Sequence, residues 1–198
     1  TYEQTQPEII STIIEAVKNK DPKAGLDTVV ETKTEKTTEA HAYIGIQTEI
    51  YTFRNSCSDG KYGKDTDYFN TLIKWGDDDQ IIDTGAKFTD ATITEDGTYT
   101  VSVDGYDFSS DSSKLNMLFV STDFAFNNTL KVSDVVVKCD DQEIAIDNPL
   151  VMADDQGNMY IELVNIYNTD LAVLNYTMPK DSFSVTFTIK GMDSVLAA

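Results

Sequence analysis

Apolar residues in the first part of the chain recur at the spacing of a helix. The positions concerned are Ile9, Ile10, Ile13, Ile14 and Val17, with Pro7 where a first helical turn tolerates proline. Residues 21–39 are instead rich in Thr, Lys and Glu, and are interrupted by Pro22 and Gly25. The pattern predicts an amphipathic helix over residues 6–20, followed by a polar strap or linker.

After Ala40 the hydrophobic period changes to two, which is typical of strands. The clearest alternation places Phe183, Val185, Phe187 and Ile189 on one face and Ser184, Thr186 and Thr188 on the other. The predicted strands cover residues 42–54, 89–93, 97–103, 114–121, 130–139, 159–167 and 182–190. Because no helices intervene, we expect a mostly β fold: an antiparallel two-layer β-sandwich of jelly-roll or immunoglobulin-like type, with an N-terminal helix and strap.

The pattern also suggests a domain organisation. We expect the helix and strap in residues 1–39, the sandwich in residues 40–193 and a C-terminal tail in residues 194–198. Residues 55–87 show little periodicity, and a long segment without regular structure tends to be functional.

Charge narrows the classes of partner. The chain has 198 residues and a formal net charge of −19, so it repels phosphate backbones and anionic lipid headgroups. No apolar run approaches the roughly 20 residues of a membrane-spanning helix, and no signal segment follows Thr1. We therefore expect no nucleic acid and no direct membrane insertion, and we interpret the sequence as a piece of a longer protein.

The residues offer little catalytic chemistry. His41 is the only histidine, which excludes most hydrolase triads, and we expect it to be solvated. Glycine-rich phosphate-binding motifs are missing. Cys57 and Cys139 have no spacing typical of a metal or redox site, and Cys139 ends an alternating strand, so we expect it in the core. Paired carboxylates could still make a glycosidase, but acids are so numerous that such pairs arise by chance.

A calcium site explains the many acidic residues better than a catalytic pair does, because Ca²⁺ binds several oxygen ligands. The candidate ligands for a structural calcium ion are Asp59, Asp65 and Asp67; a second cluster contains Asp154, Asp155 and Asn158. Neither cluster has the spacing of an EF-hand loop, and no other cofactor is expected.

Aromatic residues give the strongest functional signal, with ten Tyr, nine Phe and one Trp. Sugar rings pack their C–H faces on aromatic planes, while neighbouring polar groups bind the hydroxyls. Tyr62, Tyr68 and Trp75 lie among Gly, Asp and Lys, which favours exposure, although Trp75 could instead cap the core. Tyr167 ends a strand face that begins apolar, so it is either the last core residue or a ligand contact.

A family resemblance adds to this interpretation. AYIGIQTEIYTFRNS is followed by YGKDTDYF and a Trp, then by TEDGTYTVSV, LNMLFVSTD, KVSDVVVKCDDQEI and NMYIELVNIYN. In order and spacing these segments resemble the accessory β-sandwich modules of secreted glycan-degrading and starch-adherence proteins, of amylosome or cellulosome type, in gut Firmicutes. The resemblance covers roughly residues 42–192.

The resemblance implies a carbohydrate-binding module of a larger, secreted or cell-surface bacterial protein, with a polysaccharide and other modules of the same chain as partners. The ligand would be an α-glucan or a plant-wall β-glycan, and a single Trp suits a curved groove for a starch chain better than a flat crystalline surface. The ligand-binding residues that the resemblance favours are Tyr51, Arg54, Asn55, Tyr62, Tyr68, Trp75 and Tyr167.

Two other interpretations stay open. A protein-binding scaffold or adhesin domain would use the same sandwich and would show an apolar surface patch without a ring-sized cleft. An enzyme would need a buried carboxylate with a strongly raised pKa in a cleft. We expect a non-catalytic, glycan-binding domain.

Overall fold

The computed structural model describes residues 37–53, 60–74, 80–110 and 112–196. The chain divides into two compact units, Thr1–Glu35 and Lys36–Ala198, and the described residues all belong to the second. The helix expected at residues 6–20, and the strap as far as residue 36, lie outside the described residues.

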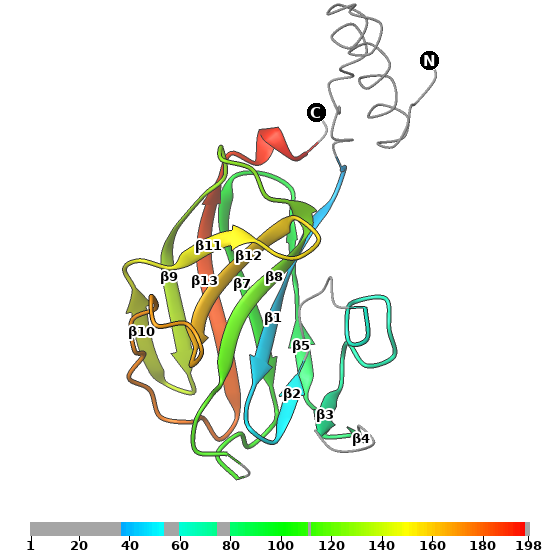
Figure 1. Ribbon diagram of the computed structural model, residues 1–198, viewed down its shortest axis with the longest axis vertical. Helices are drawn as coiled ribbons and strands as arrows, with labels where there is room; N and C mark the ends of the chain where they lie inside the picture. The colour runs from blue at the N-terminus through cyan, green and yellow to red at the C-terminus, as the bar shows by residue number, and fades with distance from the viewer. Residues whose placement is uncertain (1–36, 54–59, 75–79, 111, 197–198) are drawn as a thin grey trace, which may run out of the picture. The chain divides into compact units, whose positions relative to one another are not determined.

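The described residues form two antiparallel sheets (Figure 1). The larger sheet has the order β11 (Leu150–Ala153), β12 (Asn158–Asn165), β8 (Met117–Ala125), β1 (Ala40–Gln47), β2 (Tyr51–Phe53), β3 (Leu72–Lys74) and β4 (Gln80–Ile82), and β6 (Ala91–Ile93) also pairs with β1. The smaller sheet has the order β10 (Gln142–Ile146), β9 (Lys131–Cys139), β13 (Ser182–Lys190), β7 (Gly97–Asp104) and β5 (Lys87–Thr89). The predicted mostly β, antiparallel class is confirmed.

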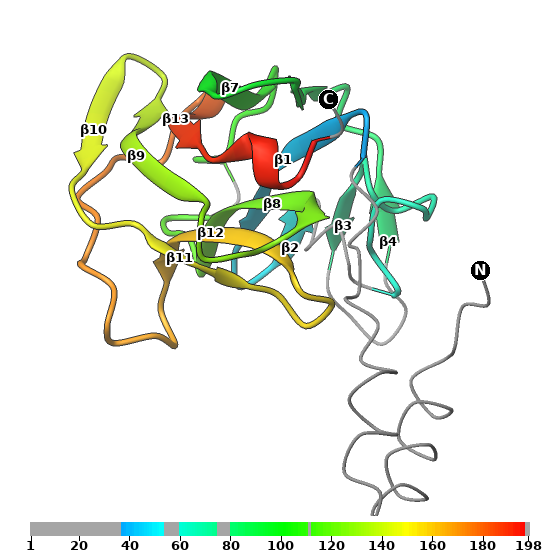
Figure 2. The same ribbon diagram turned by 90° about the horizontal axis from the view of Figure 1, so that it is seen from above.

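One hydrophobic core joins the two sheets, which Figure 2 shows as two layers. The apolar face predicted for β13 is fully buried in it, at Phe183, Val185, Phe187 and Ile189. The core also contains Cys139, as expected from the alternation in β9, where it is a free, buried thiol. This arrangement is compatible with a β-sandwich.

The polar face of β13 is bonded across the sheet. Thr188 and Thr186 pair through their hydroxyls with Thr98 and Thr100 of β7, at 2.9 and 2.8 Å. Cross-strand hydroxyl pairs of this kind stabilise a sheet. The alternation read from the sequence therefore gives both faces of β13 correctly.

The single strand predicted over residues 42–54 is wrong, because the chain reverses between β1 and β2. The turn contains no glycine, proline or asparagine; the hydroxyl of Thr48 takes their place. Its Oγ1 accepts hydrogen bonds from the backbone N–H groups of Ile50 and Tyr51, both at 3.2 Å. A Thr side chain that binds nearby backbone groups can form such a turn.

The segment expected to lack regular structure, residues 55–87, contains two short strands, β3 and β4, which extend the larger sheet beyond β2. The strand predicted over residues 89–93 is also divided, because β5 belongs to the smaller sheet and β6 to the larger one. Strands of three residues give too little alternation to be recognised.

The two ends of the described unit meet. Thr37 forms a parallel bridge with Leu196, and the Thr37 N–H donates to the Val195 carbonyl at 3.1 Å. Val195 and Leu196, expected in a tail, are buried after the short 3-10 helix η1 (Met192–Ser194). Strand register places Gln47, Met117 and Asn165 side by side at the opposite end of the larger sheet.

Candidate ligand-binding surface

Tyr51, expected to contact ligand, belongs to the core. It is 2% exposed, and its ring makes edge contacts with Phe53 and Tyr106 at centroid distances of 5.9 and 6.1 Å. Tyr51 and Phe53 share one face of β2, and that face points between the sheets. Tyr51 thus presents no ring face at the surface, and its assignment as a ligand contact is corrected.

Tyr62 and Tyr68 lie together after β2. Their rings meet edge to face at a centroid distance of 5.6 Å, and Lys61 Nζ lies 4.9 Å from the centroid of Tyr62. Tyr62 is 9% exposed, which differs from the exposure expected of it, whereas Tyr68 is half-buried. Because the two rings pack on each other, they form one small cluster rather than two separate platforms.

Other expected site residues fall outside the described part of the chain. These are Arg54, Asn55 and Trp75, together with Asp59 of the calcium proposal. Asp65 and Asp67 are both exposed. Within residues 37–53, 60–74, 80–110 and 112–196, no group of three or more His, Cys, Asp or Glu side chains could hold a metal ion.

The second acidic cluster has a structural use. Asp154 Oδ1 accepts hydrogen bonds from the backbone N–H groups of Gln156 and Asn158, both at 2.9 Å. Aspartate often closes a turn in this way. These contacts shape the hairpin between β11 and β12.

Tyr167 is the one expected contact in the described residues whose ring is open to solvent, with 74% of its surface exposed. It lies two residues beyond β12, at the end of the larger sheet away from Thr37 and Leu196. Ile166 beside it is 48% exposed, and Ile50 in the β1–β2 turn is 39% exposed. An exposed aromatic therefore projects from a surface that also carries aliphatic side chains.

The turn that carries Tyr167 is tied to the sheet by several hydrogen bonds. The Ile166 N–H donates to the Asn116 carbonyl at 3.0 Å, and the Asn116 N–H donates to the Gln47 carbonyl at 2.7 Å. The Tyr167 N–H donates to Asn165 Oδ1 at 2.9 Å. Tyr167 is thus exposed as a side chain while its backbone is held in place.

A buried carboxylate lies under this turn. Glu162 is 3% exposed, and its two oxygens accept hydrogen bonds from Asn165 Nδ2 at 2.6 Å and Asn168 Nδ2 at 2.7 Å. Burial, with the charges of Glu162 and Asp154, raises the pKa of the nearby Tyr160 above its ordinary value, so that phenol stays neutral. Sequence reasoning missed Glu162, because an acidic residue in the outward position of a strand is normally solvated.

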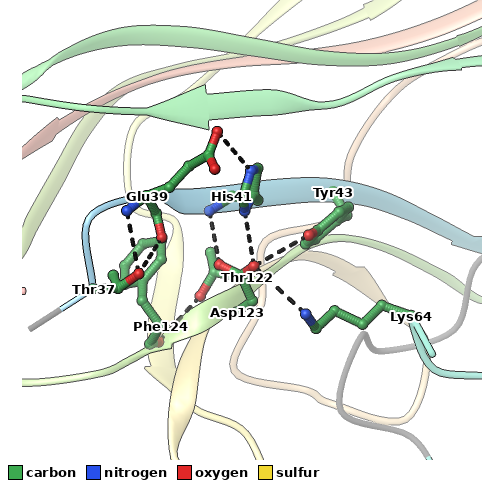
Figure 3. Close-up of polar contacts among 8 residues, drawn as sticks. All are labelled: Thr37, Glu39, His41, Tyr43, Lys64, Thr122, Asp123 and Phe124. Atoms are coloured by element: carbon green, nitrogen blue, oxygen red, sulfur yellow. Dashed lines mark hydrogen bonds and ion pairs between the residues drawn. The ribbon is translucent and has the colours of Figure 1, made fainter. Parts of the chain in front are cut away.

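A second polar cluster, which the sequence also did not reveal, centres on Asp123 of β8 (Figure 3). Its carboxylate contacts the ring Nδ1 of His41 at 2.9 Å, the hydroxyl of Tyr43 at 3.2 Å and Lys64 Nζ at 3.8 Å. His41 Nε2 lies 3.5 Å from Glu39 Oε1. The expectation that His41 is simply solvated is therefore wrong.

The Asp123 cluster connects the segment after β2 to the outer face of the larger sheet. Lys64 reaches Asp123 from this segment, and Phe69 of the same segment packs edge to face on Tyr43 at a centroid distance of 5.2 Å. Asp123 is 14% exposed as a side chain. A half-buried carboxylate with several donors stabilises the local structure, and this is the role that its contacts support.

Comparison with known proteins gives no significant match: no family model, no curated protein and no solved structure is significantly similar to the chain. In the described residues, no helix has both the length and the apolar character needed to cross a membrane.

Proposed function

We propose that the unit Lys36–Ala198 is a non-catalytic glycan-binding module of a secreted or cell-surface protein, and that its ligand is an α-glucan chain such as starch. The observation that carries the proposal is the exposed ring of Tyr167 on a turn whose backbone is fixed by hydrogen bonds. A fixed backbone lowers the conformational entropy that is lost when the ring binds a sugar face.

The composition supports a neutral ligand. The chain carries a net charge of −19, which disfavours uronic-acid, sulfated and phosphorylated polymers by repulsion. Starch and other neutral glucans do not meet this barrier.

The test is affinity gel electrophoresis of the whole chain against amylopectin, xylan, mannan and soluble cellulose derivatives. We expect retardation by amylopectin, and we expect Tyr167→Ala to weaken it by about ten- to a hundredfold, the range of stacking on one aromatic side chain. Tyr167→Phe keeps the ring and should keep the affinity, whereas Tyr167→Leu keeps only apolar character and should lose it. Equal affinity for the Leu and Phe variants would contradict stacking.

A protein-binding scaffold or adhesin is the second candidate, and one observation favours it. Ile166 and Val173 in the same connection between β12 and β13 are 48% and 97% exposed. Exposed aliphatic side chains near an aromatic one are common at protein interfaces. If no glycan retards the chain, this candidate replaces the glycan-binding module.

The structural calcium ion stays a proposal for residues around Asp65 and Asp67. Repeating the electrophoresis and a thermal melt with and without a chelator tests it directly. A fall in melting temperature on chelation, reversed by added calcium, would support a structural ion, and an unchanged melt would exclude one.

A further inference from the structure

We propose that Glu162 is the positioning residue of this surface: its carboxylate orients the amides of Asn165 and Asn168, which hold the turn that presents Tyr167. This inference rests on the proposed function, since it states how the ring is made ready for a ligand.

Glu162 lies on the face of the larger sheet that points away from the core. Its neighbours in β12, Ile161 and Leu163, are in the core, and side chains alternate along a strand. Even so, only 3% of Glu162 is exposed. A carboxylate removed from water is costly unless hydrogen bonds replace the lost solvent, and the two asparagine amides supply such bonds.

Each chain of hydrogen bonds donates in one direction, from a backbone N–H of the turn through an asparagine amide to the carboxylate of Glu162. Asn165 donates through Nδ2 to Glu162 and accepts the Tyr167 N–H through Oδ1 at 2.9 Å. Asn168 donates through Nδ2 to Glu162 and accepts the Asp170 N–H through Oδ1 at 3.1 Å. The side-chain amide of each asparagine therefore donates one hydrogen bond and accepts another.

An ionised carboxylate sets this direction, because it accepts hydrogen bonds and cannot donate them. It forces both Nδ2 groups toward itself and leaves both Oδ1 atoms for the backbone. A glutamine of the same shape has one donor group, which would face an Nδ2 group of one asparagine. That asparagine would have to turn or withdraw, and the backbone N–H that it holds would lose its acceptor.

The first variant is Glu162→Gln, measured by amylopectin affinity with Tyr167 left intact. We expect the affinity to fall about tenfold, the equivalent of one or two lost hydrogen bonds. Combining Glu162→Gln with Tyr167→Ala should weaken binding no further than Tyr167→Ala alone, because Glu162 acts through the ring. Fully additive losses would overturn the proposal.

A second variant restores the pattern of donors and acceptors without restoring the original residues. In Glu162→Gln combined with Asn165→Asp, the new amide donates to the new carboxylate, which still accepts the Tyr167 N–H. The single oxygen of the new amide still accepts from Asn168, and the net charge equals that of the unchanged chain. We expect affinity within about threefold of the original, whereas Asn165→Asp alone places two carboxylates together and should weaken binding.

A readout without glycan separates this proposal from the proposed function. Backbone N–H exchange, followed by NMR, should accelerate about tenfold at Tyr167 and Asp170 in Glu162→Gln, and should return to its original rate in the double swap. Unchanged exchange would overturn the positioning role whatever the glycan assay shows. Faster exchange in Glu162→Gln with unchanged amylopectin affinity would also overturn it. If the chain without substitutions binds no glycan, only the proposed function is removed.

Discussion

Asp123 accepts two hydrogen bonds from the same residue, one from the backbone N–H of His41 at 2.7 Å and one from its ring Nδ1 at 2.9 Å. The two residues are 82 positions apart in the chain. The carboxylate also contacts Tyr43 and Lys64, so one side chain joins β8, β1 and the segment after β2 (Figure 3).

Removing this carboxylate should destabilise the fold. We expect Asp123→Ala to lower the free energy of unfolding by about 1–3 kcal/mol, because it leaves the donors of His41 and Tyr43 without their acceptor. Urea denaturation at pH 7 measures the change. Asp67→Ala, measured in the presence of a chelator so that no calcium ion contributes, is the control, since Asp67 is exposed in the same segment that Lys64 belongs to. It should change stability by less than about 0.5 kcal/mol. Equal effects of the two substitutions would contradict the role of Asp123.

Gly191, just before η1, should tolerate no side chain. Its φ is +90°, and a Cβ atom there would lie 2.6 Å from the Thr129 carbonyl oxygen, which is backbone and cannot easily move. Gly157 has a similar φ of +86° with no heavy atom within 4 Å of such a Cβ. In thermal melts we expect Gly191→Ala to lower the melting temperature clearly more than Gly157→Ala, which bears only the conformational cost. Similar shifts would show that the close approach is relieved by small movements.

Asp140 should make stability depend on pH in the acid range. Desolvation raises its pKa, but hydrogen bonds from the backbone N–H groups of Lys180, Ser182 and Asp181, with the charge of Lys180, outweigh it and hold the pKa below the ordinary 3.8. A lowered folded-state pKa contributes stability that is present above the unfolded value and is lost as the pH falls through the folded value.

The matched variant is Asp140→Asn, because Asp140 has a φ of +49° that asparagine also adopts. Urea unfolding at several pH values between 7 and 2 should show the variant less stable at neutral pH, with the difference shrinking below about pH 4 as the aspartate is protonated. A difference that stays constant down to pH 2 would contradict a contribution from the charge.

Cys139 should be unreactive in the folded protein. Burial, together with the nearby charge of Asp140, raises the pKa of its thiol to about 12, and the side chain is 3% exposed. Because the thiolate is the reactive form, a Cys57→Ser variant should react with a thiol reagent at pH 8 only after denaturant is added. Rapid reaction of the native variant would show that β9 opens in solution.

The fold could be predicted where alternation is long. The nine residues of β13 have the predicted bounds because four apolar side chains alternate with polar ones. The turn at Thr48 could not be predicted, since a hydroxyl replaces the usual turn residues. The three-residue strands β3 and β4 depend on pairing with β2 and with each other, which periodicity does not reveal.

For the candidate site, too, some residues could be predicted from the sequence and others depend on contacts that only the fold creates. The sequence leaves open whether Tyr167 is a core residue or a ligand contact, because its exposure depends on where β12 ends. The assignment of Tyr51 rests on the family resemblance, whereas its place in β2, paired with β3, puts its ring in the core. Glu162 and Asp123 acquire their roles from partners that folding brings together, and a carboxylate in the sequence gives no indication of whether it will be buried.

The bridge between Thr37 and Leu196 has a mechanical consequence for the proposed binding of a polymer. Both ends of the described unit emerge at one end of the larger sheet, whereas Tyr167 lies at the other. A force applied between Tyr167 and the paired ends at Thr37 and Leu196 would therefore act along the length of β1, β8 and β12. Strands pulled along their length share the force among many hydrogen bonds between strands at once. The unit would therefore resist a force along the strands better than a force that separates Thr37 from Leu196 and then opens the sheets one hydrogen bond at a time.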